Sequence, residues 1–254
     1  YPSMATTTAT QLDTTFKKEV FEGLNTFPKY LSSKYFYDKK GDKLFQDIMA
    51  MPEYYLTGCE FQIISSHTET IGELFRDREN GLDLIELGAG DGKKTKVLAE
   101  EMPALNVDAE VGEYFEVLER LKGFNKRKKV IMVLGSNIGN LKHPKAIEFL
   151  TQLKNVMLPD DLLFMGFDQK KNPQSNPETG TAKSFLVANE AMQVTIEKLK
   201  LTVNFDQWET IHTEISQKYD DKTVQWLAEK SGLEIETSFT DEKGYYKNYA
   251  FRKL

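Results

Sequence analysis

A glycine-rich turn at residues 86–92, Glu-Leu-Gly-Ala-Gly-Asp-Gly, has the composition of a nucleotide-binding loop. It follows the apolar run Leu82–Ile85 and precedes a helix-like segment from Lys93 to Leu98. Glycines accept positive φ and let the backbone approach a ligand, and the first amides of the next helix point at whatever lies above the strand. The spacing therefore predicts a cofactor loop at the carboxyl end of a strand, although a tight turn without a ligand gives the same pattern.

A second glycine-rich loop, residues 134–140 with the sequence Leu-Gly-Ser-Asn-Ile-Gly-Asn, ends the apolar run Val130–Leu134. In a doubly wound sheet, ligands bind in the crevice outside the carboxyl ends of the strands, so two such loops predict one shared pocket. The Asn140 amide can both donate and accept hydrogen bonds, which suits a polar ligand. Capping of the following turn is the alternative role for this residue.

Tyrosines gather in two segments of the N-terminal part, Lys34–Asp38 and Pro52–Tyr55. Each tyrosine offers a flat apolar face with a hydroxyl at its tip, so these side chains could hold a cation or an amine. Half-buried packing residues would have the same composition. The two segments are therefore candidates for substrate binding rather than proof of it.

Polar residues alternate near the other end of the chain. His212, Glu214 and Ser216 lie on one face if residues 211–216 form an extended segment. A carboxylate and a hydroxyl side by side in a cleft could bind a ring N–H. On an exposed strand they would form only its solvated side, and the sequence leaves both interpretations open.

Strands and helices alternate through the middle of the chain, after a helical N-terminal section with helices expected at 12–24, 42–49 and 59–75. The spacing predicts a parallel, doubly wound sheet with strands at 83–87, 130–134 and 162–167 and helices from 94 and at 145–155. Later segments look antiparallel, at 183–187, 193–196 and 201–205. A helix at 221–231 and a hairpin of 233–239 with 245–251 would add one antiparallel strand to the sheet.

Composition excludes several classes of partner. The 254 residues carry a net charge of −6, which argues against nucleic acid and membrane surfaces, and the basic run Lys126–Lys129 is expected to be a solvated loop before a strand. Cys59 is the only cysteine, which suits a reducing compartment, and there is no apolar leader or spanning run, so we expect a cytoplasmic monomer. His67 and His143 lack partners at metal-ligand spacing, and we expect no metal.

Taken in order, these motifs resemble the histidine-specific Nα-methyltransferases, the S-adenosylmethionine-dependent enzymes that make trimethylhistidine for ergothioneine. The resemblance is carried by Lys34-Tyr35-Phe36-Tyr37-Asp38 with Gly41 and Leu44-Phe45, by residues 52–57, by residues 86–90 with Lys94-Thr95, and by residues 135–140 and 213–216. It implies an α/β fold, with a Rossmann-like class I methyltransferase sheet and a smaller α+β substrate-binding lobe. S-adenosylmethionine is the implied cofactor, and free histidine is the implied small-molecule partner.

The resemblance also implies roles for individual residues. The implied cofactor-binding residues are Gly88, Gly90, Lys94, Glu113 and Tyr114. The implied substrate residues are Tyr54 and Asn140 at the amine and carboxylate, and Glu214 and Ser216 at the imidazole, with Tyr37 and Tyr54 as the catalytic pair. The implied domains are a tag-like, unstructured start at 1–13, a substrate lobe of 14–60 and 174–217, and a methyltransferase core of 61–173 and 218–254.

Two family segments have no counterpart in this sequence. A β-strand ending in the acid that binds the ribose should follow the helix after the first loop, but Met102-Pro103 leads almost directly into Leu105-Asn106-Val107, and a crossover needs a dozen or more residues. A helical stretch with a further substrate tyrosine is missing after residues 168–172. Either both segments have been lost, or separate pieces of a longer chain are joined near 101–105 and 172–175, which we favour.

The same residues leave two other functions open. One is a methyltransferase for another small amino acid or amine. The other is a binding protein that kept the pocket and lost the ribose part of the cofactor site. Turnover with different amino acids separates the first from histidine methylation, and binding of S-adenosylhomocysteine separates the second.

Overall fold

The structure is a computed structural model that describes residues 4–36, 39–49, 51, 53–88, 92–100, 114–171 and 175–254. The chain forms two compact units, Tyr1–Asp47 with Lys183–Ile215 and Ile48–Ala182 with Ser216–Leu254. Each unit consists of two separate stretches of sequence. The divisions fall after residues 47, 182 and 215, whereas the sequence led us to expect them after 60, 173 and 217.

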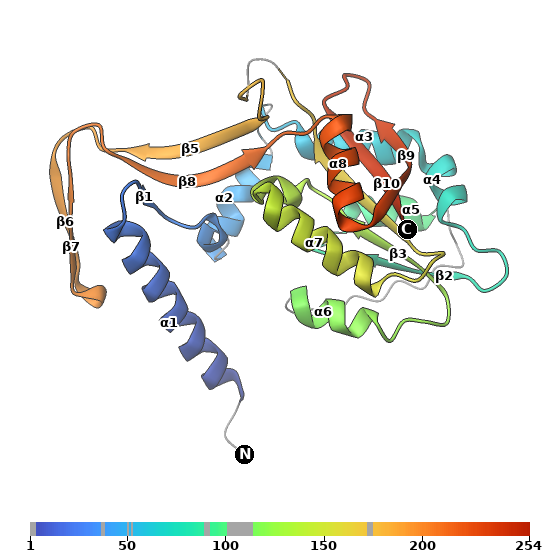
Figure 1. Ribbon diagram of the computed structural model, residues 1–254, viewed down its shortest axis with the longest axis horizontal. Helices are drawn as coiled ribbons and strands as arrows, with labels where there is room; N and C mark the ends of the chain where they lie inside the picture. Colours follow the sequence, from blue (N-terminus) through green and yellow to red (C-terminus); the bar gives the residue numbers. More distant parts are fainter. Residues whose placement is uncertain are drawn as a thin grey trace. The chain divides into compact units, whose positions relative to one another are not determined.

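The second unit contains a five-stranded sheet in the order β2-β3-β4-β10-β9 (Figure 1). The strands are β2 (Leu82–Glu86), β3 (Lys128–Val133), β4 (Leu162–Asp168), β9 (Leu233–Thr240) and β10 (Tyr246–Lys253). β2, β3 and β4 pair in parallel, and β10 runs antiparallel to both β4 and β9. The expected parallel sheet with one antiparallel strand is therefore confirmed.

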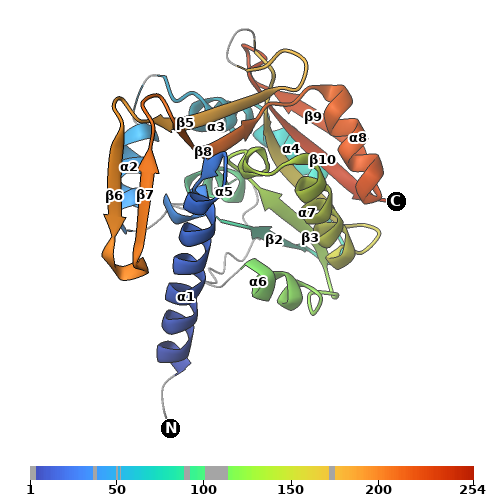
Figure 2. The same ribbon diagram turned by 60° about the vertical axis from the view of Figure 1, so that its left-hand side comes forward.

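Helices cover both faces of this sheet. One face packs against α3 (Leu56–Ser66), α4 (Thr68–Phe75) and α5 (Lys93–Glu100), and the other packs against α6 (Tyr114–Leu121), α7 (His143–Val156) and α8 (Asp221–Ser231). Figure 2 shows α7 and α8 side by side on their face. All seven residues of β4 are buried, as expected for a central strand with helices on both sides. The unit is thus a three-layer α/β/α domain.

The helix expected at 59–75 is two helices, divided at His67. The backbone there leaves the helical region, with φ −119° and ψ 18°. The Thr68 hydroxyl donates to the carbonyl oxygen of Ile64 at 2.7 Å and so takes an acceptor that a continuous helix would use for a backbone N–H. Within α3, Phe61 is 42% exposed while Glu60 is fully buried.

The basic run Lys126–Lys129 is not a solvated loop throughout, so that expectation was wrong for its second half. β3 begins at Lys128, and Lys129 is 1% exposed. The Lys129 ammonium forms an ion pair with Asp161 at 2.7 Å, and the same carboxylate accepts the Lys129 backbone N–H at 2.7 Å. A buried lysine needs such a partner, and here the pair joins the starts of two neighbouring strands.

The first unit combines a long helix with short strands. Its helices are α1 (Met4–Asn25) and most of α2 (Lys39–Met49), with a 3-10 turn at Ser33–Phe36. α1 begins at Met4, so the expected unstructured start through residue 13 was wrong. Leu24 of α1 packs against Leu201, Val203 and Phe205 in a small core.

Two small sheets complete the first unit. β1 (Lys29–Tyr30), β8 (Thr210–Gln217) and β5 (Thr181–Val187) form one in the order β1-β8-β5, with β1 and β8 parallel. β6 (Met192–Ile196) and β7 (Leu201–Phe205) form an antiparallel hairpin. The boundary between the units falls within β5 and β8. The antiparallel pairing expected for the segments at 193–196 and 201–205 is confirmed.

His67 and His143 each lie against an aromatic ring, 5.4 Å from Phe239 and 5.6 Å from Trp226 between ring centroids. Within the described ranges, no three or more His, Cys, Asp or Glu side chains come together in a way that could hold a metal ion. A search of the same residues for a helix of membrane-spanning length and hydropathy finds none.

The packing around Gly166 yields a stability prediction. A Cβ at this β4 residue would overlap the Glu60 Oε1 atom and the Tyr246 hydroxyl, both of which are buried and hydrogen-bonded to each other at 3.1 Å. We expect Gly166→Ala to lower the free energy of unfolding by about 1–3 kcal/mol, as other overpacked core variants do. Chemical denaturation measures this.

Gly58→Ala is the matched control. Gly58 lies in α3, and a Cβ there would meet nothing within 4 Å. Alanine should stabilise this helix by about 0.4–1 kcal/mol through the unfolded state. Equal stability of the two variants would contradict the described packing of Gly166 against Glu60.

Candidate active site

The two glycine loops open at the carboxyl ends of neighbouring strands. Gly88 follows β2 with φ +74°, and Gly135 follows β3 with φ +84°, a region that favours glycine. A Cβ at either position would meet no atom of the described residues within 4 Å. The Leu87 N–H donates to the Met132 carbonyl at 2.9 Å, so the strands stay paired up to the loops. Both loops therefore lie at one edge of the sheet, as the sequence predicted.

The Glu60 carboxylate connects the second glycine loop with α5, the helix that follows the first loop. This α3 side chain is fully buried and accepts four hydrogen bonds. Its Oε2 atom accepts from the Lys94 ammonium at 2.6 Å and from the Gly135 N–H at 2.8 Å. Its Oε1 atom accepts from the Tyr246 hydroxyl at 3.1 Å and from the Asn248 amide at 2.9 Å. One carboxylate thus connects α3, α5, the second loop and β10.

The electrostatics of this cluster favour Lys94 as a ligand-binding group. An ammonium has three N–H donors, and Lys94 gives one to Glu60 while its side chain stays 18% exposed. It can therefore also bind a ligand carboxylate. Burial raises the pKa of Tyr246 well above its usual range, and the Glu60 charge raises it further, so its hydroxyl stays protonated as a donor.

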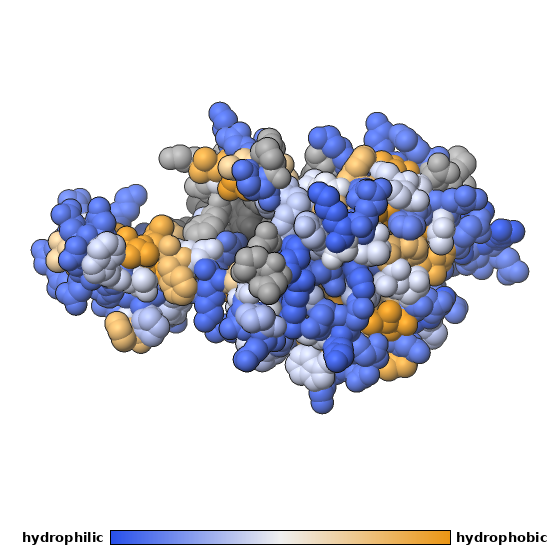
Figure 3. All heavy atoms as spheres, turned by 90° about the horizontal axis from the view of Figure 1, so that it is seen from above, coloured by the Kyte–Doolittle hydropathy of each residue, from blue (hydrophilic) through white to orange (hydrophobic). Residues whose placement is uncertain are grey.

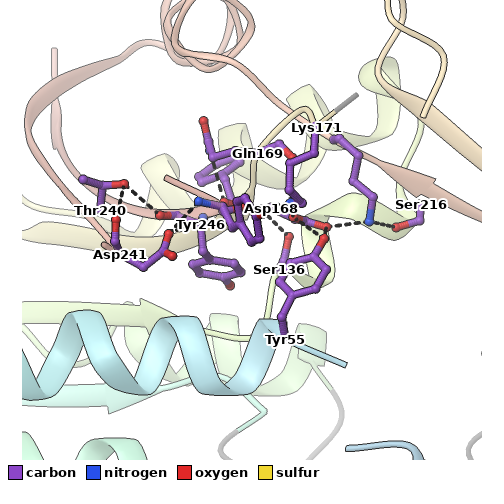
Figure 4. Close-up of polar contacts among 12 residues, drawn as sticks. Tyr55, Ser136, Asp168, Gln169, Lys171, Ser216, Thr240, Asp241 and Tyr246 are labelled. Atoms are coloured by element: carbon purple, nitrogen blue, oxygen red, sulfur yellow. Dashed lines mark hydrogen bonds and ion pairs between the residues drawn. The ribbon is translucent and has the colours of Figure 1, made fainter. Parts of the chain in front are cut away.

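A second cluster surrounds Asp168 at the end of β4 (Figure 4). The Tyr55 hydroxyl lies 2.9 Å from both carboxylate oxygens. The Lys171 ammonium donates to Oδ1 at 2.6 Å, and the Lys218 ammonium donates to Oδ2 at 2.5 Å. The Asp168 N–H donates to Ser136 Oγ at 3.0 Å, which connects this cluster with the second glycine loop.

Burial sets the protonation of the Asp168 cluster. It raises the pKa of Tyr55 above its usual range, and the Asp168 charge adds to the effect, so Tyr55 remains a donor. It lowers the pKa of Lys171 although Asp168 opposes the shift. The Lys171 ammonium also lies over the Tyr55 ring, 4.3 Å from its centroid. With two ammonium groups around one carboxylate, the cluster carries a net positive charge.

Ser216 belongs to the same cluster through Lys218. The Lys218 ammonium donates to Ser216 Oγ at 2.8 Å as well as to Asp168. Ser216 is half-buried near the end of β8. Figure 4 shows Ser216 and Asp168 on either side of the shared nitrogen.

The other predicted substrate residues of the second unit are accessible. Tyr54 is half-buried just before α3, and its neighbour Tyr55 is the residue that bonds Asp168. Asn140 ends the 3-10 turn Asn137–Asn140, and its exposed side chain makes no hydrogen bond to a described residue. It does not cap α7 either, because the N-cap there is Lys142. The capping alternative is therefore wrong.

Glu214 lies in the first unit, on β8, where it is half-buried. No hydrogen bond or ion pair joins its carboxylate to the described part of the chain. The expected extended segment at 211–216 is confirmed by β8, and His212 packs against Phe185 with 5.3 Å between ring centroids.

Several predictions fall outside what can be compared. Tyr37, Gly90 and Glu113 lie outside the described residues, as do residues 101–105 and 172–174 at the two places where a join was predicted. Tyr114 opens α6.

Sequence reasoning missed Glu60 and Asp168, although both left a signal. Glu60 stands one helical turn before Ile63 and Ile64, so it shares their buried face. Asp168 directly follows the apolar run Leu162–Phe167, at the strand end where ligands bind in α/β sheets. A charged residue in either position is worth noting because it must be paired.

A five-stranded sheet of this order, with helices on both faces and two glycine loops at one edge, defines a class I S-adenosylmethionine-dependent methyltransferase. The mitomycin 7-O-methyltransferase MmcR has the same fold, with a TM-score of 0.50 and 15% identity over 88% of this chain and 61% of that one. The chain belongs to the family described as histidine-specific methyltransferase, SAM-dependent, whose model matches residues 16–104, 96–175 and 173–253. It is therefore an S-adenosylmethionine-dependent enzyme.

Curated relatives agree with this family. The chain is 26% identical to the histidine N-alpha-methyltransferase of Mycobacterium tuberculosis, over 90% of this chain and 92% of that protein. The values for the Mycolicibacterium smegmatis protein of the same name are equal. The first alignment covers 300 positions, more than the 254 residues here, so the relative has positions that this chain lacks. The family matches also meet near residues 96–104 and 173–175, where two family segments were found missing.

The residues of the second unit fit the amino-acid end of S-adenosylmethionine. The Lys94 ammonium suits its carboxylate, and the open backbone at Gly88 allows close approach. An acid for the ribose hydroxyls is not assigned.

Glu60→Gln tests the carboxylate that connects the second loop with α5. An amide carries one acceptor oxygen and no charge, so it cannot replace both carboxylate oxygens opposite four donors. We expect the free energy of unfolding to fall by about 1.5–3 kcal/mol, measured by chemical denaturation, because the hydrogen bond to the charged Lys94 is weakened.

The matched control is Glu69→Gln, at an exposed residue of the neighbouring helix α4. Surface changes of this kind stay within about 0.5 kcal/mol. If the two substitutions shifted the denaturation midpoint equally, Glu60 would not hold the second loop and α5 together.

Proposed function

We propose that this protein methylates the α-amino group of L-histidine and forms trimethylhistidine. The observation that carries the proposal is the pair of glycine loops on neighbouring strands, with Glu60 connecting the second loop to Lys94 in the helix that follows the first. The family membership and the relatives named histidine N-alpha-methyltransferase support the choice of substrate.

The chain's own part in the reaction is to bind and align. When bound, S-adenosylmethionine supplies an electrophilic methyl group on a sulfonium, which is a good leaving group. Gly88, Gly90 and Lys94 would hold the amino-acid end of this cofactor, and Glu113 with Tyr114 would lie near its adenosine. Holding the amine in line with the methyl and the sulfur can lower the barrier by roughly 7–11 kcal/mol.

The amine must be uncharged when it attacks. In the proposal, Tyr54 and Asn140 hold the α-amine and carboxylate of histidine, with Tyr37 close by. Tyr37, Tyr54 or a water that they hold passes the amine proton outward, which is a modest general-base contribution. The exposed, uncommitted amide of Asn140 is consistent with this role.

Selectivity for histidine would come from Glu214 and Ser216. A carboxylate that accepts a ring N–H leaves an unpaired charge when another amino acid binds, and this penalty rejects the wrong substrate. The half-buried Glu214 carboxylate has no ion pair within the described chain, so it is available to a ligand.

The proposal includes a cytoplasmic, monomeric enzyme acting on a free small molecule. Its support is the net charge of −6 and the single cysteine. Light scattering after size-exclusion chromatography measures the molar mass in solution, and we expect the mass of one chain, 29.1 kDa.

Mass spectrometry of histidine incubated with the protein and S-adenosylmethionine tests the function. We expect products that carry one, two and three added methyl groups, all on the α-amine. A panel of other amino acids and small amines serves as the control. Turnover of one of these but not of histidine would assign a different substrate, and absence of S-adenosylhomocysteine binding in calorimetry would indicate a non-catalytic relative.

Glu214→Ala should weaken histidine binding and leave cofactor binding unchanged. Loss of one hydrogen bond to a charged group corresponds to roughly a 10- to 100-fold higher Kd for histidine. Calorimetry should find the Kd for S-adenosylhomocysteine unchanged. Glu190→Ala, at an exposed carboxylate of the same unit, is the control and should change neither value. Equal losses for histidine and cofactor would speak against the role of Glu214.

A further inference from the structure

Lys218 holds a fixed position between two oxygens. Its ammonium donates to Asp168 Oδ2 at 2.5 Å and to Ser216 Oγ at 2.8 Å, and its side chain is 13% exposed. Its backbone N–H also donates to the Gly180 carbonyl at 2.7 Å. Lys218 is therefore held both at its backbone and at its ammonium group.

Asp168 cannot easily release Lys218. Its side chain is 2% exposed, and the Lys171 ammonium and the Tyr55 hydroxyl bind the same carboxylate. Because a nearly buried carboxylate keeps its cationic partners, the Lys218 ammonium stays where it can reach Ser216. The position of Lys218 is thus set by the end of β4.

An ammonium nitrogen has no lone pair and can only donate, so Ser216 Oγ must accept this hydrogen bond. The single hydrogen of the Ser216 hydroxyl is then turned away from Lys218. We infer that Lys218 is a positioning residue that turns the Ser216 hydrogen away from itself and so leaves it available to the substrate. This inference rests on the proposed function, in which Ser216 meets the imidazole.

The consequence is a preference among substrates. One lone pair of the Ser216 oxygen is used by Lys218, and the hydroxyl hydrogen pairs best with a ring atom that accepts it, such as a nitrogen with a free lone pair. A C–H at that place would leave the Ser216 hydrogen without a partner, which weakens binding. Lys218 therefore contributes to specificity without touching the substrate.

A double-mutant cycle tests this coupling. Histidine Kd is measured by calorimetry, with S-adenosylhomocysteine present, for wild type, Lys218→Met, Ser216→Ala and the double variant. We expect each single change to weaken histidine binding about tenfold. The double variant should be no weaker than either single variant within about threefold, because both changes remove the same directed hydroxyl.

Lys171→Met is the matched control, since Lys171 binds the same Asp168 carboxylate and has no hydrogen bond to Ser216. In the Lys171→Met background, Ser216→Ala should still raise the histidine Kd by the same factor as in the wild type. Lys218→Arg, which also can only donate, should restore most of the histidine affinity. If Lys218→Met fails to fold, Lys218→Gln completes the cycle, because its amide oxygen can accept the Ser216 hydrogen and release it from the substrate.

The inference would be overturned if the fold-increases in histidine Kd caused by the Lys218 and Ser216 substitutions multiplied in the double variant. Histidine binding by the wild type would then leave the proposed function standing. A wild type that binds S-adenosylhomocysteine but no histidine would contradict both.

Discussion

The buried carboxylate of Glu60 is the interaction on which the candidate site depends. It accepts hydrogen bonds from Lys94, Gly135, Tyr246 and Asn248, which come from three separate parts of the second unit. A fully buried carboxylate is stable only when its charge is compensated and its lone pairs are used. The folding requirement of this one residue therefore also ties the second glycine loop to α5, the helix that follows the first loop.

Asp168 plays the corresponding part at the next strand end. Its register partner on β10 is Tyr246, the same residue whose hydroxyl reaches Glu60, so the start of β10 supports both clusters. The two carboxylates differ in their surroundings, because Glu60 pairs with one lysine while Asp168 pairs with two. Of the two lysines at Asp168, Lys218 also donates to Ser216.

Periodicity predicted the frame of the second unit well. The apolar run of β4 and the helix at 221–231 were foreseen because burial on both faces, or on one helical stripe, shows directly in the residue types. The position of both glycine loops followed from the strands they end. Helical spacing puts Glu60 on the buried face of α3, but it could not identify the partners of Glu60 or the burial of Lys129, because a buried charge resembles a surface charge until its distant partner is known. Contacts between Glu60 and Asn248, far apart in sequence, exist only after the sheet has formed.

The exposure of β2 bears on the two missing family segments. All five residues of β2 are half-buried, whereas β3 is buried from Lys129 to Val133, and β2 ends the strand order of the described sheet. An edge strand with apolar residues such as Leu82, Leu84 and Ile85 can pair with the strand of another molecule. Proteins usually cover such an edge or place charged residues on it. A longer chain with a further strand after α5 would pair it, so the character of β2 favours the interpretation that pieces of a longer chain are joined here.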